Sequence, residues 1–514
     1  MTRKICLILN ITLLLSIFLT QTNLKKANAN TNPTMWIVAK DGSGNFTSIS
    51  EAIYNESVSN GDTIFVRSAT YFENIVINKS ISLIGEDPNK TVIKGNGTYS
   101  VIFVNSNNVT IANFTVTGSG MRPPDSAIYV NSSSEVVIKY NKIIDNNNGI
   151  SFYSSVNNLI LGNVIANNSF PGIFAVSTRD SFISSNFISG NMKGIAFYIS
   201  TKNHIVNNTV NNSKEEGIYL DSSSSSIIYH NNFHQNAVQT WSNMANVWDY
   251  EGEGNYWSDY NGSDFFTGFY QNETGSDGIG DTPYIINANN RDNFPLMGPF
   301  YAHDVYVGGE EHQVSLISNS TISNFSFKIG QETGNRMLNF SVAGEDGSTG
   351  FCRVSVPTRL MNYTLVLLVD GEEAIPTFLN LQRESYRCIY FTYNHSVHVV
   401  TIISSKELSL YNELLAEYIH LMEKFVSLNE SYLSLLDGLS LLMDSYAQLQ
   451  SNYTELYKLY RGLLLKYDES LQNLQNLTYA FLAAITLFIA VIIYLSKRAH
   501  MIRSSSEADM DKTG

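Results

Sequence analysis

The chain has 514 residues, which is more than one hydrophobic core usually holds, so about three domains are expected. Charged residues make up 15% and aromatic residues 12%, a composition typical of tightly turned β-structure and not of disorder. The formal net charge is −14, with no basic run outside the termini, which argues against a nucleic-acid partner.

The N-terminus has the parts of a secretory signal peptide. Arg3 and Lys4 precede an apolar run over residues 5–19, and the following polar stretch ends in Ala27-Asn28-Ala29, which fits the small-x-small cleavage rule. We expect residues 1–29 to be a signal peptide and the mature chain to begin near Asn30.

A repeat of 22 or 23 residues dominates the first half of the chain. Its first mark is an apolar-x-x-Asn unit, with Asn at positions 141, 163, 186, 208 and 231. Gly-Ile pairs recur in phase, with Gly at positions 149, 172, 194 and 217. Each period holds short β-branched and aromatic runs separated by Asn, Gly or Ser, residues that suit tight corners. The repeat predicts a parallel β-helix over residues 35–300, with the recurring Asn side chains stacked inside it as a hydrogen-bonded ladder.

Two stretches resemble known families. Residues 36–53, reading WIVAKDGSGNFTSISEAI, and the segment ISLIG at 81–85 resemble the opening of pectin methylesterases, where this stretch starts a right-handed β-helix. The repeats, followed by GNYWSDY at 254–260, DGIGDTPY at 277–284 and DNFPL at 292–296, are similar to the NosD-like surface β-helix proteins common in archaea. The resemblance implies a right-handed, pectin-lyase-like parallel β-helix.

No catalytic residue is expected on this β-helix. The QDT, DFIFG and LGRPW segments of pectin methylesterases are absent, and acidic residues are scattered across the repeats. Lys193 and Glu216 lie one period apart and are expected to form a surface ion pair, not an acid and a base. Carbohydrate binding or adhesion on a flank lined by aromatic residues and Asn fits better. A polysaccharide lyase or hydrolase, and an architectural envelope component, are the alternatives.

Metal sites have little support in the sequence. His230 and His234 are about 13 Å apart on a continuous strand, so copper binding is not expected despite the copper-binding description of the resembled family. Asp277 and Asp281, with glycines between them, are a weak candidate for Ca²⁺; the alternative is a Gly/Asp turn that closes the end of the β-helix.

Residues 303–404 contain longer alternating apolar runs separated by turns such as Asp346-Gly347. About seven strands in 100 residues predict an immunoglobulin-like β-sandwich. Cys352 and Cys388 lie in two of these strands, and in an exported protein they are expected to form a disulfide.

Residues 405–476 repeat with a period of seven, which predicts a coiled-coil stalk and a homo-oligomer. The first apolar position of the heptad is filled by Tyr411, Tyr418, Phe425, Tyr432, Leu439, Tyr446, Tyr453, Tyr460, Tyr467 and Leu474. Leucine fills the position three residues later from Leu414 to Leu477, with Ser470 as the single gap. The pattern leaves open two strands, three strands or an antiparallel pair.

The C-terminal region predicts a single membrane span. Residues 477–495 carry no charge and are long enough to cross a hydrocarbon layer of about 30 Å. Lys497 and Arg498 follow directly, so the tail 496–514 is expected in the cytoplasm and the rest of the mature chain outside. The Asn-x-Ser/Thr sequons in the predicted exported part agree with this topology. The ectodomain is expected to bind a polysaccharide or a glycoprotein. We expect it to carry glycans at Asn45, Asn78, Asn108, Asn131, Asn261, Asn324, Asn362 and Asn394.

Overall fold

The computed structural model describes residues 33–268, 270–379 and 385–507. The predicted signal peptide and the end of the predicted cytoplasmic tail, residues 508–514, lie outside the described residues. The chain divides into two compact units between Ser409 and Leu410.

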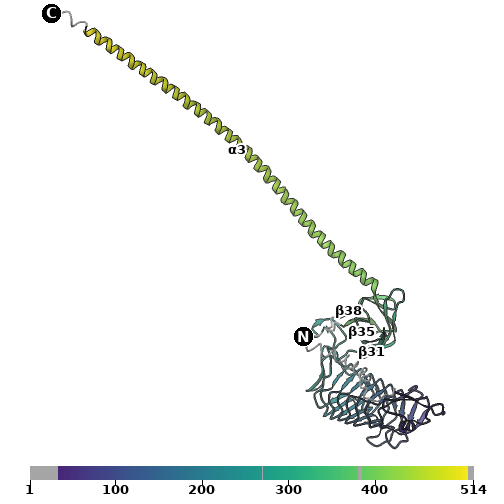
Figure 1. The fold of residues 1–514 in the computed structure, drawn as a ribbon. Helices are drawn as coiled ribbons and strands as arrows, with labels where there is room; N and C mark the ends of the chain where they lie inside the picture. The colour runs from purple at the N-terminus through teal and green to yellow at the C-terminus, as the bar shows by residue number, and fades with distance from the viewer. Residues whose placement is uncertain (1–32, 269, 380–384, 508–514) are drawn as a thin grey trace, which may run out of the picture. The chain divides into compact units, whose positions relative to one another are not determined.

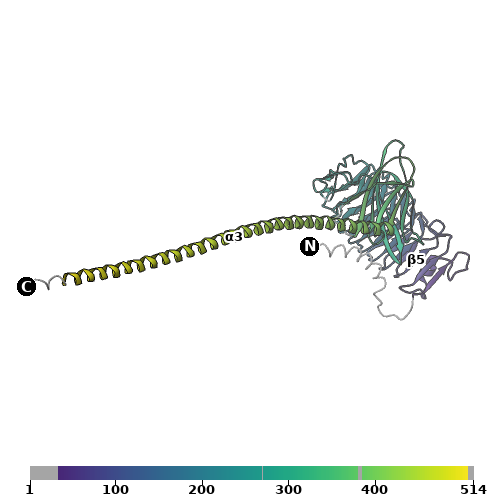
Figure 2. The same ribbon diagram turned by 90° about the horizontal axis from the view of Figure 1, so that it is seen from above.

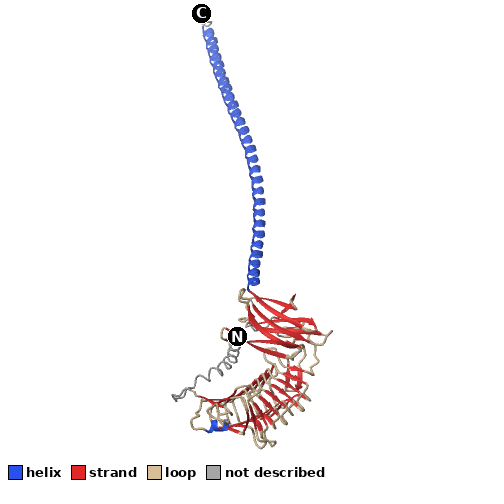
Figure 3. Ribbon diagram, turned by 90° about the vertical axis from the view of Figure 1, so that its right-hand side faces the viewer, coloured by secondary structure: helices blue, strands red, loops and turns tan. Residues whose placement is uncertain are grey.

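The N-terminal part of the first unit is a right-handed parallel β-helix with three sheets. Each sheet takes one strand from each successive coil, so neighbouring strands in space are far apart in sequence (Figures 1 and 3). Sheet A contains β1 (Met35–Val38), β2 (Thr63–Val66), β5 (Ser82–Gly85), β8 (Thr110–Ala112), β11 (Val137–Lys139), β14 (Leu159–Leu161), β17 (Phe182–Ser184), β20 (His204–Val206) and β23 (Ile227–Tyr229). Strand β5 lies among the purple N-terminal coils in Figure 2.

Sheets B and C complete each coil. Sheet B contains β3 (Thr70–Phe72), β6 (Val92–Lys94), β9 (Thr115–Thr117), β12 (Lys142–Ile144), β15 (Val164–Ala166), β18 (Phe187–Ser189), β21 (Thr209–Asn211), β24 (Asn232–His234) and β26 (Tyr256–Trp257). Sheet C contains β4 (Ile75–Ile77), β7 (Ile102–Val104), β10 (Ser126–Asn131), β13 (Asn148–Tyr153), β16 (Ile173–Val176), β19 (Ile195–Tyr198), β22 (Glu216–Asp221) and β25 (Val238–Ser242). The predicted parallel β-helix is confirmed.

The core of the β-helix is a set of aliphatic columns. In sheet A, for example, Ile160 pairs with Ile183 on the next coil, and Ile183 pairs with Ile205. All three side chains are at most 1% exposed. Asn at the corners adopts the left-handed conformation that it tolerates better than most residues, as at Asn207, with φ 58°. One coil of the β-helix therefore takes 22 or 23 residues.

The predicted asparagine ladder is present inside the β-helix. The backbone N–H and the Nδ2 of Asn163 both donate to Oδ1 of Asn186, at 2.9 and 3.0 Å. Asn186 donates in the same way to Asn208, at 3.0 and 2.9 Å. The ladder continues through Asn231 to Asn255, whose backbone N–H donates to Oδ2 of Asp292 at 2.7 Å. The ladder gives buried amide groups hydrogen-bond partners on each coil, and apolar side chains could not do this.

A short helix lies at the N-terminal end of the β-helix, and irregular segments lie at the other end. Helix α2 (Ile49–Tyr54) begins at Ser48, whose side chain accepts a hydrogen bond from the N–H of Glu51, and buries Ile49, Ala52 and Ile53. At the C-terminal end are two hairpins, β27 (Phe266–Thr267) with β28 (Glu273–Thr274) and β29 (Tyr284–Asn287) with β30 (Asn290–Asp292).

Two antiparallel five-stranded sheets follow within the first unit. One contains β31 (Phe300–Val307), β32 (Glu310–Ser318), β35 (Thr349–Pro357), β38 (Thr377–Leu379) and β39 (Tyr386–Asn394); the other contains β33 (Thr321–Ile329), β34 (Arg336–Ala343), β36 (Thr364–Val369), β37 (Glu372–Ala374) and β40 (His398–Ser405). Buried residues from both sheets, such as Val354 and Phe340, form one hydrophobic cluster. The described residues here contain ten strands and not seven, because the sequence pattern missed β31 and the short β37 and β38.

The last element is the single continuous helix α3 (Lys406–Glu507), drawn from green to yellow in Figure 1. It contains the heptad region and the predicted span without a break. The helix is long and apolar enough to cross a membrane, which is consistent with single-pass anchoring. Its apolar side chains, for example Leu414 and Tyr418, are exposed in the part of the chain that the structure describes.

Candidate functional site

An aromatic ladder runs along sheet C. Seven rings on successive coils make six contacts, with centroids 4.5 to 5.7 Å apart: Phe103, Tyr129, Tyr153, Phe174, Tyr198, Tyr219 and Trp241. The strands carry apolar side chains that alternate with these rings and point into the core, as Ile128 and Val130 flank Tyr129. The first six rings are half-buried and Trp241 is 38% exposed, so the ladder lies on the outer face of the sheet.

Between Tyr129 and Tyr219 the ladder alternates between two columns of the sheet. Tyr129 is in register with Ser151, Ser151 with Phe174, and Phe174 with Ala196. On the two coils where this column holds Ser151 or Ala196, the ring comes two residues later on the same face, as Tyr153 or Tyr198. The small residues make room for diagonal contacts between rings, which continue the ladder from coil to coil.

The geometry of the ladder exposes ring edges and hydroxyls. In the middle, neighbouring ring planes are tilted by 46° to 54°, and each face packs against the next ring. Burial raises the pKa of Tyr129, Tyr153, Tyr198 and Tyr219, so these phenols keep their protons at neutral pH. Among the described residues, none of the four hydroxyls has a hydrogen-bond partner, so they are available as donors and acceptors to a ligand.

Trp241 ends the ladder. Its ring is stacked on Tyr219 at 4.5 Å with an angle of 11° between the planes. Strand β25 is the edge strand of sheet C, so no further ring of the ladder covers Trp241. The indole therefore offers the largest open aromatic surface of the series.

A charged group flanks the same end of the ladder. The ammonium of Lys193 lies 4.5 Å from the centroid of the Tyr219 ring and 2.7 Å from Oε2 of Glu215, and it also contacts Oε2 of Glu216. Burial lowers the pKa of Lys193, but hydrogen bonds to both carboxylates outweigh it, so the net shift is upward. Lys193 is thus a cation held in place by two carboxylates. The predicted pairing of Lys193 with Glu216 is confirmed.

A second charged group is fully buried between the end of the β-helix and the antiparallel sheets. Nη2 of Arg353, on β35, donates to Oε1 of Glu253 at 2.9 Å, and its Nη1 donates to the backbone oxygen of Asp277 at 2.9 Å. Oε2 of Glu253 lies 2.8 Å from Nε2 of His230, and the His230 ring is stacked on Phe300. The cluster links two parts of the first unit through buried side chains.

The two Ca²⁺ candidates have different hydrogen-bond and ion-pair partners. The Asp277 carboxylate lies 3.3 Å from Nη1 of Arg353, and Asp281 accepts hydrogen bonds from the backbone N–H groups of Phe265 and Phe266. Burial, with added repulsion from Asp277 and Asp281, raises the pKa of Asp264 to about 6 despite two backbone N–H donors. Within the described ranges, no group of three or more His, Cys, Asp or Glu side chains could hold a metal ion. The arrangement fits the alternative, a Gly/Asp turn at the end of the β-helix.

The histidines do not form a copper site either. His204 is on sheet A, stacked on Phe182 at 4.4 Å, while His234 is on sheet B and His230 is engaged by Glu253. The three rings are on different faces of the coil, so the residues present do not fit a copper centre.

The predicted disulfide is wrong in this structure. Cys352 and Cys388 are both free and buried. They lie on the paired strands β35 and β39, but Cys352 is opposite Phe391 and Cys388 is opposite Ser355, so the two are three positions out of register. Because side chains alternate across a strand, Cys352 faces the hydrophobic cluster and Cys388 the opposite side of the sheet.

The predicted glycosylation sites lie at accessible positions. Seven of the eight are exposed, and Asn131, at the end of β10, is half-buried. Their modification stays a prediction.

Sequence reasoning did not name the residues of the aromatic ladder. The signal was present, because an aromatic residue stands two or four positions after each recurring Gly: Tyr153, Phe174, Tyr198 and Tyr219. Which of these rings touch across coils follows only from the strand register.

Comparison with known proteins agrees with this architecture. The family described as periplasmic copper-binding protein (NosD) matches residues 55–262. A probable pectinesterase/pectinesterase inhibitor 17 of Arabidopsis thaliana is 40% identical over 77 residues, which span 15% of this chain and 15% of that relative.

Two solved structures are similar to part of this chain. A pectin methylesterase in complex with a hexasaccharide is 12% identical with a TM-score of 0.27, over 43% of this chain and 94% of that one. The catalytic domain of a GH87 alpha-1,3-glucanase in complex with nigerose is 16% identical with a TM-score of 0.33, over 48% of this chain and 49% of that one. At these scores, the likenesses carry no argument about activity.

The fold and the family match define a class, the parallel β-helix proteins. Within it, this chain is a NosD-like parallel β-helix protein with a long apolar C-terminal helix.

Proposed function

We propose that this protein is a membrane-anchored surface protein that binds a carbohydrate polymer along the aromatic ladder, without catalysis. The ladder is the single observation that carries the proposal. Seven rings on successive coils, about 4.8 Å apart along the axis, make a strip roughly 29 Å long. A strip of apolar edges with regularly spaced hydroxyls suits an extended chain of sugar rings, because each sugar has both C–H faces and hydroxyls.

The charges beside the strip favour a neutral polymer. Lys193 is the cation at the Trp241 end, and Glu215, Glu216 and Asp221 are nearby carboxylates. Because Lys193 is already paired with two of them, no free cation there would neutralise a polyuronate. A neutral glycan avoids this repulsion.

The remaining parts of the proposal concern how the strip is displayed. The proposal includes an N-terminal ectodomain outside the membrane and an immunoglobulin-like arrangement of the two antiparallel sheets. It also includes a coiled-coil stalk and glycans on the predicted sequons. The apolar C-terminal helix supports the anchoring. The exposed heptad side chains of α3 support the stalk.

The test is a glycan array probed with the full chain in detergent, followed by affinity measurements on a bound oligosaccharide. Trp241→Ala is expected to weaken binding at least roughly tenfold, about 1.4 kcal/mol. Phe187→Ala is the matched control, because Phe187 is 44% exposed on a strand of sheet B, away from the ladder. Equal affinity of the two variants, or a preference for polygalacturonate over neutral glycans, would contradict the proposal.

The rival function is a polysaccharide-active enzyme, and the Lys193, Glu215 and Glu216 group is the observation that favours it. Release of new reducing ends or unsaturated products from a glycan by the wild type, with loss of that activity in Lys193→Ala, would replace the binding function by catalysis. We expect no such products.

A further inference from the structure

The apolar face of helix α3 is wider than a two-stranded coiled coil needs. The first apolar heptad position is called a here, the leucine position three residues later d, and the position after d is e. Position e is apolar in seven heptads: Leu415, Met422, Leu436, Met443, Tyr457, Leu464 and Leu471. All seven are between 39% and 67% exposed on the single helix. Within the described ranges, this third column is open to solvent.

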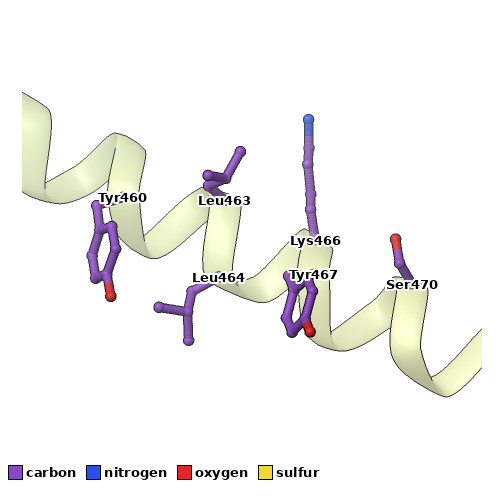
Figure 4. Close-up of a pocket in the computed structure, with 6 residues that line it drawn as sticks. All are labelled: Tyr460, Leu463, Leu464, Lys466, Tyr467 and Ser470. Carbon is purple, nitrogen blue, oxygen red and sulfur yellow. The ribbon is translucent and has the colours of Figure 1, made fainter.

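Helix geometry places the e column beside the a column. Successive residues turn by about 100°, so d and e lie on either side of a and the three columns cover an arc of about 100°. Figure 4 shows Tyr460 (a), Leu464 (e) and Tyr467 (a) pointing to the same side of the helix. Polar or charged residues usually fill e in two-stranded coiled coils, whereas a stripe of three columns is typical of helices in larger bundles.

The membrane anchoring in the proposed function sets the direction of the helices. The heptads run into residues 477–495 within one continuous helix, and that segment is apolar enough to cross a membrane. Copies anchored by the same segment in one membrane have their C-termini at the same level. Their stalks are therefore parallel and in register, and an antiparallel pair is excluded.

We propose that the stalk is a parallel bundle of at least three copies of this chain, with the a, d and e columns all in contact. The proposal rests on the stalk of the proposed function and adds the number and direction of its strands. Bulky Tyr at a fits it, because a third helix leaves a wider core and the e leucines can pack beside the rings.

The bundle also has a consequence for binding. Three or more β-helices on one stalk would meet the same polymer together. Linked sites of modest affinity then bind with an avidity that can exceed that of one site by about a hundredfold or more. A short oligosaccharide would not gain from this.

The experiment compares two pairs of leucines in the full chain, purified in detergent, with the mass of the protein part measured by light scattering. Leu436→Glu with Leu464→Glu changes two e positions, at 42% and 44% exposure. Leu441→Glu with Leu465→Glu changes two leucines outside a, d and e, at 69% and 66% exposure. The second pair introduces the same charges, so it is the matched control.

We expect wild type and the control pair to have at least three times the monomer mass of 57.4 kDa before signal removal, and the e pair to have a lower mass. A wild-type dimer, or an e pair with unchanged mass, would overturn the bundle. A wild-type monomer would refute the stalk association itself, and the Trp241→Ala test of carbohydrate binding would be unaffected. Circular dichroism shows whether the helix persists, and Leu436→Ala with Leu464→Ala repeats the comparison without added charge.

Discussion

Nη2 of Arg353 and Oε1 of Glu253 are 2.9 Å apart, and both side chains are at most 3% exposed. One belongs to the antiparallel sheets and the other to the end of the β-helix, 100 residues earlier in the chain. In a buried ion pair of this kind, each charge is tolerated in the protein interior only because the other is present. The junction within the first unit therefore depends on both residues.

Replacement of Arg353 by Gln should destabilise the protein by about 3–5 kcal/mol, because it removes the buried guanidinium that pairs with the carboxylates of Glu253 and Asp277. Urea unfolding followed by tryptophan fluorescence would measure this. Arg67→Gln is the control, since the Arg67–Glu86 pair is also close, at 2.7 Å, but solvent-exposed, and should cost at most about 1 kcal/mol. Similar losses for the two variants would show that the Arg353 cluster is not buried as described.

Asn186→Ala should interrupt the asparagine ladder in mid-column. Asn186 accepts from Asn163 and donates to Asn208 and to the backbone oxygen of Ile160, and the variant strands these groups inside the core. Each orphaned buried group costs about 1–3 kcal/mol, so a total loss of roughly 3 kcal/mol or more is expected in the same unfolding assay. Asn105→Ala, at an exposed position, should stay within about 0.5 kcal/mol of wild type.

Both cysteines should be found as thiols. Burial raises the pKa of Cys352 to about 11 and also raises that of Cys388, so neither forms a reactive thiolate at neutral pH. A maleimide should leave the native protein unlabelled and label both residues after unfolding without reductant. A linked Cys352–Cys388 peptide in unreduced protein would mean that β35 and β39 pair in a different register.

Asp264 should make the protein less stable as the pH rises. Its pKa is about 6 in the folded protein and about 4 in an unfolded chain, so between these values the folded state holds the extra proton. The contribution of Asp264 to the free energy of unfolding is therefore fully present below about pH 4 and decreases between about pH 4 and pH 6. It stays low above about pH 6. The measurement is the wild-type unfolding free energy minus that of Asp264→Asn at pH 4.5 and pH 7.5. The difference should be smaller at pH 7.5, and a larger one there would show that Asp264 is stabilised as a carboxylate.

The sequence by itself determined the coil of the β-helix, the asparagine ladder and the apolar C-terminal helix. These features are periodic, and a period in sequence becomes a column in space whenever each unit stacks on the one before it. Asn186 could be placed inside the coil because its neighbours 22 or 23 residues away are also Asn. The repeat in the sequence is enough to place such residues in the fold.

Only the tertiary structure decided the contacts that depend on register or on distant segments. The diagonal ring contact between Tyr153 and Phe174 depends on which column of the sheet the aromatic residue of each coil occupies. The Arg353–Glu253 ion pair joins two segments that are not related by the repeat. The cysteine prediction was wrong for the same reason: Cys352 and Cys388 are on neighbouring strands, but a shift of three residues turns them to opposite faces. Strand pairing is set by the packing of the whole sheet, and no spacing within one strand encodes it.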